Sequence, residues 1–202
     1  MAEIIAIYGS PRRDGNSAAL LKQAVAGARQ EGAHVEEVFL RDLKISPCLE
    51  IYNCTKNGEC AIRDDFPKIL AKLESSSGVM LASPIFFYTV SAHTKIFMDR
   101  CQSLWVKKYR IENQVMGKTP EKRKGLFISV GATRGKKLFD GAILTVKYFF
   151  DVLSTKLWGT VLCRGVDRKG EIEGRDEYLK EAFEAGRSLA RVLQEERENR
   201  KS

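Results

Sequence analysis

The sequence predicts a doubly wound α/β domain, in which helices cover both faces of a parallel sheet. Strand-like apolar segments alternate with helix-like segments almost to the end of the chain, as they do in βαβ units. The segments at 78–82 and 125–131 are continuously apolar, which is typical of strands that are buried on both faces. No repeat or low-complexity linker divides the chain, so residues 1–202 are expected to form a single domain.

Strands are predicted where short apolar runs occur, and helices where apolar residues recur every three or four positions. The predicted strands are Glu3–Tyr8, His34–Phe39, Gly78–Ala82, Gly125–Gly131 and Lys156–Arg164. The predicted helices are Asn16–Glu31, Asp65–Glu74, Ser91–Ser103, Lys136–Asp151 and Asp176–Glu196. Two irregular insertions remain, Ile45–Asp64 and Lys107–Lys124, and long connections of this kind are often functional.

The composition, with 44% hydrophobic and 30% charged residues, is that of an ordinary globular protein. No apolar run is long enough to span a membrane, and the N-terminus shows no secretory signal. Five cysteines, an odd number, argue against a disulfide framework and for a reducing compartment. We therefore expect a cytoplasmic protein with no membrane partner.

The net charge is +8, and a basic stretch in the second insertion contributes much of it. Its cations are Lys107, Lys108, Arg110, Lys118, Lys122, Arg123 and Lys124. No helix-turn-helix spacing or RNA-binding aromatic signature accompanies them, so a solvated loop is favoured over a nucleic-acid site. The basic balance also suits anionic small molecules.

Residues 9–17 (GSPRRDGNS) join the first strand to the first helix. Free N–H groups and the dipole at a helix N-terminus favour phosphate binding. Ser10, Asn16 and Ser17 can add hydrogen bonds, and Arg12 adds a charge with several donors. The loop lacks the lysine of a Walker motif and the third glycine of a dinucleotide fingerprint. It therefore suits a monophosphate, and the alternative is a capped helix after a tight turn.

Two further loops follow the third and fourth strands, at residues 83–89 (SPIFFYT) and 129–135 (SVGATRG). The first offers flat aromatic walls, and the glycines of the second allow a ligand to approach the backbone closely. The candidate contacts are Pro84, Ile85, Phe86, Phe87, Tyr88, Gly131, Thr133 and Gly135. Because ligands bind beyond the carboxyl ends of parallel strands, the three loops predict a site for flavin mononucleotide (FMN). In isolation the aromatic residues also suit a core or an interface.

Three motifs together resemble a known family: GSPRxxGNS at residues 9–17, SPIFFY at 83–88, and AxxKxFMDR at 92–100. They are similar to the flavodoxin-fold family of NADPH-dependent FMN reductases, and in particular to its iron–sulfur flavoprotein branch. The resemblance implies a flavodoxin-like three-layer α/β/α fold with a five-stranded parallel sheet of order 2-1-3-4-5. It also implies that Ser10, Arg12, Asn16 and Ser17 bind the FMN phosphate, and that residues 84–88 line the flavin ring.

The cysteine segment departs from the pattern of that branch, which carries Cys-x2-Cys-x2-Cys and a later fourth cysteine. This chain keeps Cys48, Cys54 and Cys60, but Ile51 occupies the position of the second ligand. A cubane cluster requires four thiolates, and isoleucine cannot ligate iron. We therefore predict no metal site and no iron–sulfur cluster, and we interpret the segment as a loop with free thiols.

The resemblance implies an oxidoreductase that passes electrons from NAD(P)H through FMN to a quinone, a flavin, a metal ion or a protein acceptor. No catalytic side chain is expected, because the flavin carries the chemistry. Two alternatives remain: an FMN-containing electron carrier that docks to a redox protein, and a cysteine-based sensor with a structural flavin. Flavodoxin carriers are typically acidic, so the sequence pI of about 9.3 favours an enzyme.

Family members are usually dimers or tetramers with the flavin near a subunit interface, which implies a homo-oligomer here. Large apolar residues in and after the third-strand loop are the expected interface. They are Phe86, Phe87, Tyr88, Phe97, Leu104 and Trp105. Exposed aromatic residues are costly unless a partner covers them.

Overall fold

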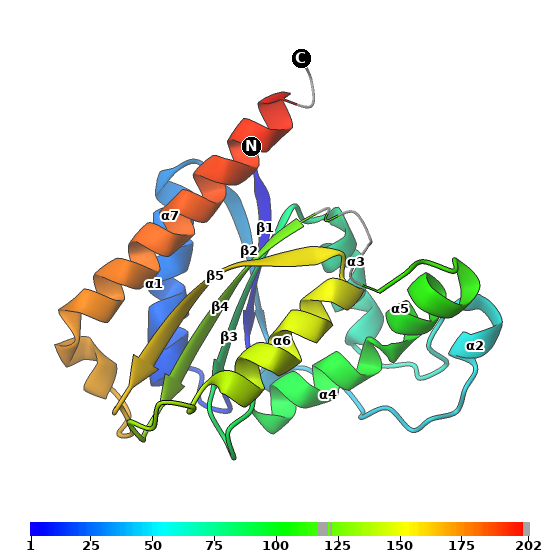
Figure 1. Cartoon of the computed structure of the whole chain (residues 1–202), viewed down its shortest axis with the longest axis horizontal. Helices are drawn as coiled ribbons and strands as arrows, with labels where there is room; N and C mark the ends of the chain where they lie inside the picture. Colours follow the sequence, from blue (N-terminus) through cyan, green and yellow to red (C-terminus); the bar gives the residue numbers. More distant parts are fainter. Residues whose placement is uncertain (117–120, 122, 200–202) are drawn as a thin grey trace.

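A computed structural model describes residues 1–116, 121 and 123–199. Its centre is a parallel sheet with the strand order β2-β1-β3-β4-β5 (Figure 1). The strands are β1 (Glu3–Tyr8), β2 (His34–Phe39), β3 (Gly78–Pro84), β4 (Arg123–Gly131) and β5 (Thr155–Arg164). The predicted order 2-1-3-4-5 is thereby confirmed.

Helices flank the sheet on both sides, as the α/β alternation predicted. The described helices are α1 (Asn16–Gln30), α2 (Cys54–Asn57), α3 (Phe66–Ser75), α4 (Ala92–Arg100), α5 (Gln102–Val106), α6 (Asp140–Val152) and α7 (Asp176–Asn199), of which α2 and α5 lie beside the sheet's helical layers rather than on the sheet. Short helical turns are η1 (Leu40–Asp42), η2 (Lys107–Ile111) and η3 (Glu171–Gly174). Within the described ranges no helix combines the length and apolarity needed to cross a membrane.

Each face of the sheet has its own apolar core, because successive side chains of a strand point to opposite faces. From β1, Ile4 and Ala6 pack against α1 and α7 on one face. Ile5 and Ile7 pack against α3, α4 and α6 on the other face. Figure 1 shows these two helical layers on opposite sides of the sheet.

The helices α1 and α7 approach each other closely through two glycines. A Cβ atom on Gly27 of α1 would collide with the Phe183 carbonyl, and one on Gly186 of α7 would collide with the Ala24 carbonyl. The absence of a side chain at both positions lets the two backbones come into contact. This contact joins the first and last helices of the chain.

Two predicted helices differ from the observed ones. The helix predicted over 91–103 is divided into α4 and α5, because the Cys101 N–H bonds to the Met98 carbonyl and tightens the turn there. The helix predicted from Lys136 begins at Asp140, since residues 135–138 form a turn closed by the Leu138 N–H and the Gly135 carbonyl. Gly135 is therefore not at a helix N-terminus.

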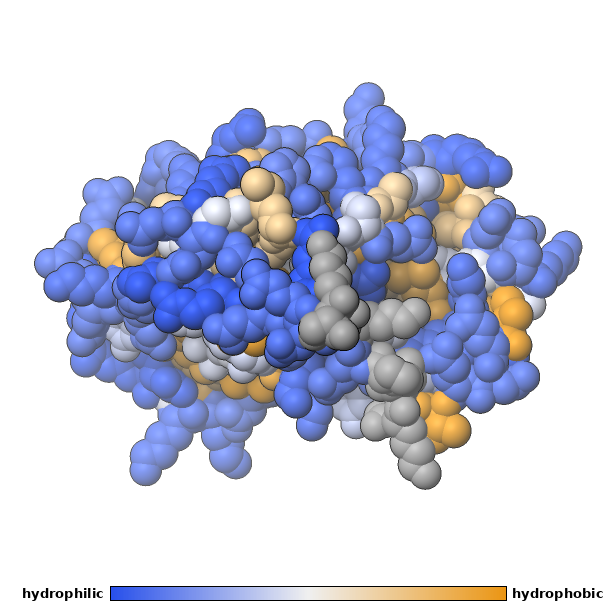
Figure 2. Space-filling view, turned by 90° about the horizontal axis from the view of Figure 1, so that it is seen from above, coloured by the Kyte–Doolittle hydropathy of each residue, from blue (hydrophilic) through white to orange (hydrophobic). Residues whose placement is uncertain are grey.

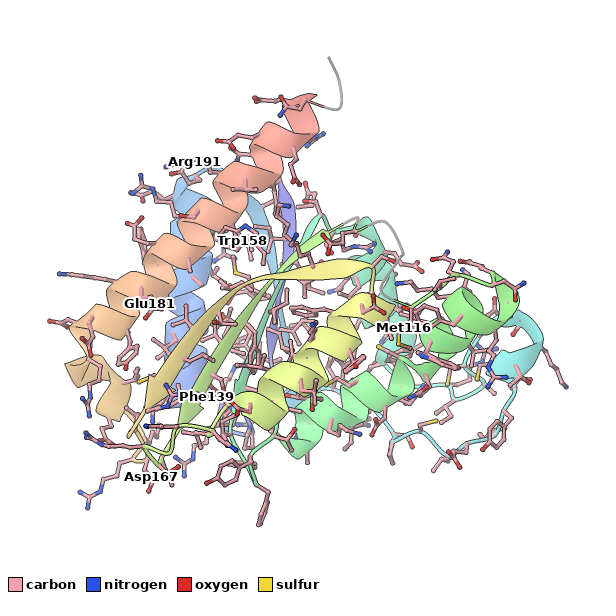
Figure 3. The ribbon with its side chains drawn as sticks, viewed as in Figure 1. Met116, Phe139, Trp158, Asp167, Glu181 and Arg191 are labelled. Carbon is pink, nitrogen blue, oxygen red and sulfur yellow. The ribbon has the colours of Figure 1, made fainter. Side chains whose placement is uncertain are left out.

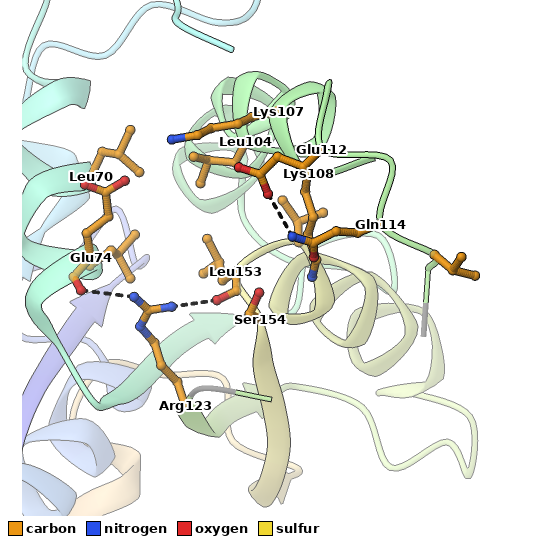
Figure 4. Close-up of a pocket in the computed structure, with 13 residues that line it drawn as sticks. Leu70, Glu74, Leu104, Lys107, Lys108, Glu112, Gln114, Arg123, Leu153 and Ser154 are labelled. Atoms are coloured by element: carbon orange, nitrogen blue, oxygen red, sulfur yellow. Dashed lines mark hydrogen bonds between the residues drawn. The ribbon is translucent and has the colours of Figure 1, made fainter. Parts of the chain in front are cut away.

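The basic stretch is not a solvated loop throughout, so that prediction is wrong for two of its cations. Lys108 is buried and donates to the Asp151 carbonyl near the end of α6. Arg123 donates to the carbonyls of Glu74 and Leu153 at 3.1 and 2.9 Å (Figure 4). Both cations satisfy carbonyl groups near helix C-termini. Lys118 and Lys122 lie outside the described residues.

The strands begin at one edge of the sheet and end at the other. Seen from the edge where they begin, the surface is mostly hydrophilic, with apolar residues scattered over it (Figure 2). Phe139 and Asp167 lie at the opposite end of the molecule, where β4 and β5 end (Figure 3). The three predicted ligand loops belong to this carboxyl edge.

Candidate functional site

The loop after β1 ends at the first turn of α1, as its sequence predicted. The Gly9 N–H bonds to the Ala82 carbonyl at 2.8 Å, which holds the loop against β3. The first bond inside the helix runs from the Ala19 N–H to the Gly15 carbonyl at 2.9 Å. The preceding N–H groups of α1 therefore remain at the helix end, where an anion is stabilised.

The side chains of this loop differ in exposure. Ser10 and Ser17 are buried, whereas Arg12 is exposed. The Ser10 hydroxyl accepts a bond from the Arg12 N–H at 3.0 Å, so it shapes the turn as well as facing the helix end. The backbone of Arg12 is bonded in the turn while its residue is exposed, and its predicted contact with a phosphate stays a prediction.

Asn16 is engaged elsewhere in the protein. Its Nδ2 donates to the Arg168 carbonyl at 2.9 Å. Its Oδ1 accepts bonds from the N–H groups of Gly170 and Ile172 at 3.1 and 3.4 Å. The amide thus ties the start of α1 to the loop after β5, and the second Nδ2 hydrogen and the backbone N–H of Asn16 are left for an anion. The predicted phosphate contact by Asn16 stays a prediction.

A buried set of hydroxyl groups joins the three loops. Ser91 donates to the Gly9 carbonyl and accepts a bond from the Thr94 N–H at 3.3 Å. Its own N–H bonds to the Ser83 hydroxyl at 2.9 Å. The Ser129 hydroxyl donates to the Ser83 carbonyl at 2.7 Å. Buried networks whose members are all paired hold their elements rigidly, so these hydroxyl groups fix the relative positions of the loops.

The aromatic loop after β3 forms a strained hairpin turn. Phe86 and Thr89 exchange two backbone bonds of 3.0 and 3.1 Å around Phe87 and Tyr88. Both central residues have positive φ angles, 49° and 62°, as in a type I′ turn, which favours Asn and Gly. Bulky residues in this region store strain, and such strain is concentrated at functional sites.

The exposure of this turn also suits a ligand-binding role. Phe87 is 101% exposed, and Phe86 and Tyr88 are 47% and 56% exposed. Pro84 and Ile85 are half-buried below them. The turn therefore presents three aromatic side chains at the carboxyl edge of the sheet, with two apolar residues beneath.

The loop after β4 lies next to the aromatic turn. A Cβ atom on Gly135 would lie 3.9 Å from the Tyr88 hydroxyl, and one on Gly141 would lie 2.6 Å from the Tyr88 carbonyl. Gly131 is buried and Thr133 is exposed. Because β1, β3 and β4 are neighbours in the sheet, the structure brings all three predicted loops to one edge.

The cysteine insertion is anchored by a buried cation, Arg100, which the sequence analysis did not single out. Arg100 is 1% exposed and pairs with Asp64. It also donates to the Ser46 carbonyl at 3.0 Å, and its guanidinium lies 4.8 Å from the centre of the Phe66 ring. Asp64 accepts bonds from the N–H groups of Ser46 and Phe66 at 2.9 and 3.0 Å. One ion pair therefore holds both ends of the insertion.

The electrostatics of Asp64 follow from these contacts. Partial burial raises the pKa of Asp64, but hydrogen bonds from Arg100 and from the backbone of Ser46 and Phe66 lower it. The net pKa lies below its ordinary value, because the bonds to the charged form outweigh desolvation. The carboxylate is therefore charged when it holds the insertion.

The three cysteines of the insertion line one cavity of about 900 Å³. Trp105, Arg110 and Ile51 also line it. Leu49, Ile51 and Tyr52 are 61%, 58% and 62% exposed. Within the part of the chain that the structure describes, no three His, Cys, Asp or Glu side chains are grouped so that they could hold a metal ion.

The predicted interface residues do not lie together on the surface. Phe97 is fully buried in the core and contacts the Phe66 and Phe149 rings, so its assignment to an interface is wrong. Leu104 and Trp105 are half-buried. Phe97 lies on the face of α4 that packs against α3 and α6, so its side chain points into the core and not to the surface.

An apolar strip of exposed side chains continues from the aromatic turn along α6. Thr89 contacts Thr145 of α6 at 3.4 Å between hydroxyl oxygens. Leu144 and Tyr148 are 56% and 57% exposed, and their four-residue spacing places them on one face of the helix. Helix α6 was predicted, but no pattern in the sequence indicated that its outer face shares a surface with Tyr88.

Solved proteins with this arrangement share the flavodoxin-like class of fold. A NAD(P)H:quinone oxidoreductase from Methanothermobacter marburgensis has a TM-score of 0.69 at 16% identity, covering 93% of this chain and 95% of that one. A flavodoxin from the domain Archaea has a TM-score of 0.56 at 15% identity, covering 95% and 99%. At these identities the likeness shows the fold.

Residues 2–138 match the model of the family described as NADPH-dependent FMN reductase, and the chain belongs to that family. An iron–sulfur flavoprotein of Methanocaldococcus jannaschii is 35% identical over 132 residues. The match covers 65% of this chain and 63% of that relative. The chain thus matches less than two thirds of that relative's length.

Proposed function

We propose that the chain is an FMN-dependent NAD(P)H oxidoreductase, acting as one domain of residues 1–202 in the cytoplasm. A quinone, a flavin, a metal ion or a protein would receive the electrons. One observation carries the proposal: free N–H groups at the start of α1 lie at the same sheet edge as the strained aromatic turn. Membership of the FMN reductase family supports it.

The residues at this edge fit the two ends of FMN. The N-terminus of α1, the Ser10 and Ser17 hydroxyl groups and the Arg12 guanidinium would hold the phosphate. Phe86, Phe87 and Tyr88 would cover the apolar ring, because their side chains are otherwise exposed to water.

The loop after β4 would bind the polar edge of the ring. Of its residues Gly131, Thr133 and Gly135, the last lies beside Tyr88, so backbone N–H groups of this loop would face a ligand that rests on the aromatic turn. When bound, FMN supplies hydride and single-electron chemistry that no side chain provides. The protein fixes the ring's position, excludes water from it and supplies N–H dipoles where negative charge develops.

The proposal is tested by adding flavins to the purified protein. We expect it to bind FMN in preference to FAD, because the first loop suits one phosphate. Rapid mixing of the FMN-loaded protein with NADPH or NADH should bleach the flavin absorbance. A protein that binds FMN but is not bleached by either nucleotide would be an electron carrier. A protein that takes up no FMN would contradict both readings.

We further propose that a second copy of the chain covers the aromatic turn and the α6 strip. The strip continues directly from the flavin edge, so its burial would exclude water from one side of the ring. Light scattering at micromolar concentration should give a dimer or tetramer of the 22.7 kDa chain. A monomer that retains FMN and activity would contradict this.

The three-thiol insertion is proposed to lack a four-thiolate cluster, because Ile51 stands at the second cysteine position of the Cys-x2-Cys-x2-Cys pattern. Its side chain is exposed and cannot coordinate iron. Iron and sulfide analysis of protein isolated without oxygen should show no stoichiometric cluster. Ile51→Cys is the matched variant, in which a restored thiol would recover cluster binding if Cys48, Cys54 and Cys60 are correctly placed.

A further inference from the structure

The loop between β4 and α6 carries three exposed cations: Arg134, Lys136 and Lys137. Within the described residues, none of the three forms an ion pair. In the loop after β1, Arg13 pairs with Asp42 at 3.0 Å. Three cations without a counterion on one short loop indicate a site for an anion.

The backbone carbonyls of the same loop are bonded to β5 and to the loop that follows it. The carbonyls of Gly131 and Thr133 accept bonds from the Gly165 N–H at 2.8 and 3.2 Å. The carbonyls of Gly135 and Lys136 accept bonds from the Arg164 side chain, both at 3.3 Å. These four carbonyls therefore face β5 and its following loop.

A trans peptide directs its N–H opposite to its carbonyl. The N–H groups that follow the four carbonyls belong to Ala132, Arg134, Lys136 and Lys137, so they point away from β5. Three of them belong to the residues that carry the unpaired cations. These backbone dipoles add to the positive potential that the three cations create around the loop.

The loop is held in this conformation before any ligand arrives. Arg164 donates to the loop carbonyls and lies 4.9 Å from the centre of the Phe139 ring. Gly165 has a φ of +71°, and a Cβ there would lie 2.9 Å from Nε of Arg134. The Arg134 side chain thus lies across Gly165. A preorganised loop loses little entropy when it binds a ligand.

We propose that Arg134, Lys136 and Lys137 form a second phosphate site, which binds the phosphate groups of the nicotinamide dinucleotide. The inference rests on the proposed function. The loop adjoins the aromatic turn, since Gly135 lies near the Tyr88 hydroxyl. A dinucleotide whose nicotinamide rests on the flavin edge has its phosphates within reach of long cationic side chains on a neighbouring loop.

The test is calorimetric titration of the FMN-loaded protein with adenosine 2′,5′-bisphosphate, ADP and adenosine. The variants are Arg134→Ala and the double variant Lys136→Ala/Lys137→Ala. Lys147→Ala is the matched control, because Lys147 is an exposed cation on α6. Adenosine measures what the base and ribose contribute without a phosphate.

Each loop variant should weaken nucleotide binding by about tenfold or more, since charge-assisted contacts are strong. The Lys147 control and the FMN stoichiometry should not change. If the variants lose affinity for the 2′,5′-bisphosphate alone, the loop binds the 2′-phosphate and the protein prefers NADPH. A loss for ADP as well assigns the 5′-phosphates, which NADH shares. Either pattern supports the site.

Unchanged affinity in both loop variants, or a wild-type protein that binds no nucleotide better than adenosine, would overturn the inference. The proposed function fails differently, through a flavin that neither NADPH nor NADH reduces. Nucleotide binding is measured without that reaction, so the two failures are distinguishable.

Discussion

The carboxyl edge of the sheet and the insertion at 45–64 are both irregular, yet they are held in different ways. At the edge, Ser83, Ser91 and Ser129 connect loops that already follow adjacent strands. The insertion is centred on the buried ion pair between Arg100 and Asp64, and Lys44 and Asp65 exchange two further bonds beside it. Because several hydrogen bonds hold the edge, one substitution there should cost little stability. Because Arg100 makes several of the contacts of the insertion, its substitution should cost much more.

The largest effect is expected from Arg100→Met. Removal of one partner from a buried ion pair leaves the other uncompensated, so the free energy of unfolding should fall by about 3–5 kcal/mol. Urea denaturation measures it. Lys95→Met is the control, because the Lys95–Asp99 pair on the same helix is largely exposed. An equal loss in both variants would show that Arg100 does not anchor the insertion.

The next effect concerns the edge and is expected in ligand affinity. Arg12→Ala removes a charge-assisted contact and should weaken FMN binding by about 1.5–3 kcal/mol, or one to two decades in Kd. Arg13→Ala is the control, because its guanidinium pairs with Asp42 and lies over Phe39. Fluorescence titration of FMN measures both. Identical affinities in the two variants would place the phosphate away from Arg12.

A smaller effect should reveal the strain of the aromatic turn. Phe87→Asn/Tyr88→Gly gives the turn residues that suit its positive φ angles, so the FMN-free protein should gain about 1–2 kcal/mol in stability. FMN affinity should fall, because two aromatic walls are lost. Tyr148→Asn removes an exposed aromatic residue from a regular helix and serves as the control. If only the control is stabilised, the turn stores no strain.

The smallest effect is the pH dependence of the insertion. Because the pKa of folded Asp64 is lowered, its stabilisation is complete above the unfolded pKa of about 3.9 and is lost as pH falls through the folded pKa. Asp64→Asn should abolish this part of the acid sensitivity. Unfolding curves between neutral and acidic pH measure it. The same acid dependence in the variant and in wild type would assign it to other carboxylates.

The edge was predictable because its determinants are local. The apolar strand and residues 9–17 together predict a loop that ends at the N-terminus of a helix. The strand order then brings this loop and the loops after the third and fourth strands to the same edge of the sheet. The buried hydroxyl network was missed, although Ser83 and Ser129 stood inside the predicted loops. A serine in an apolar strand gives no sign of which distant carbonyl it will meet.

The insertion was predictable only as irregular chain. Arg100 belongs to the AxxKxFMDR motif, but nothing in that motif shows that the arginine reaches Ser46 and Asp64. Phe97, from the same motif, was assigned to the surface and lies in the core. Helical spacing limits which residues share a face, whereas the partner of that face is set by tertiary packing.

The contact between α1 and α7 joins segments that are far apart in the sequence, so it limits how early the start of α1 can reach its folded state during translation. Helix α1 is translated well before α7, the helix that packs against Gly27. The hydrogen bonds between Asn16 and residues 168–172 can also form only after those residues have been translated. Although domains emerge from the N-terminus first, the turn at the start of α1 gains these contacts only after residues 168–172 and α7 have been translated.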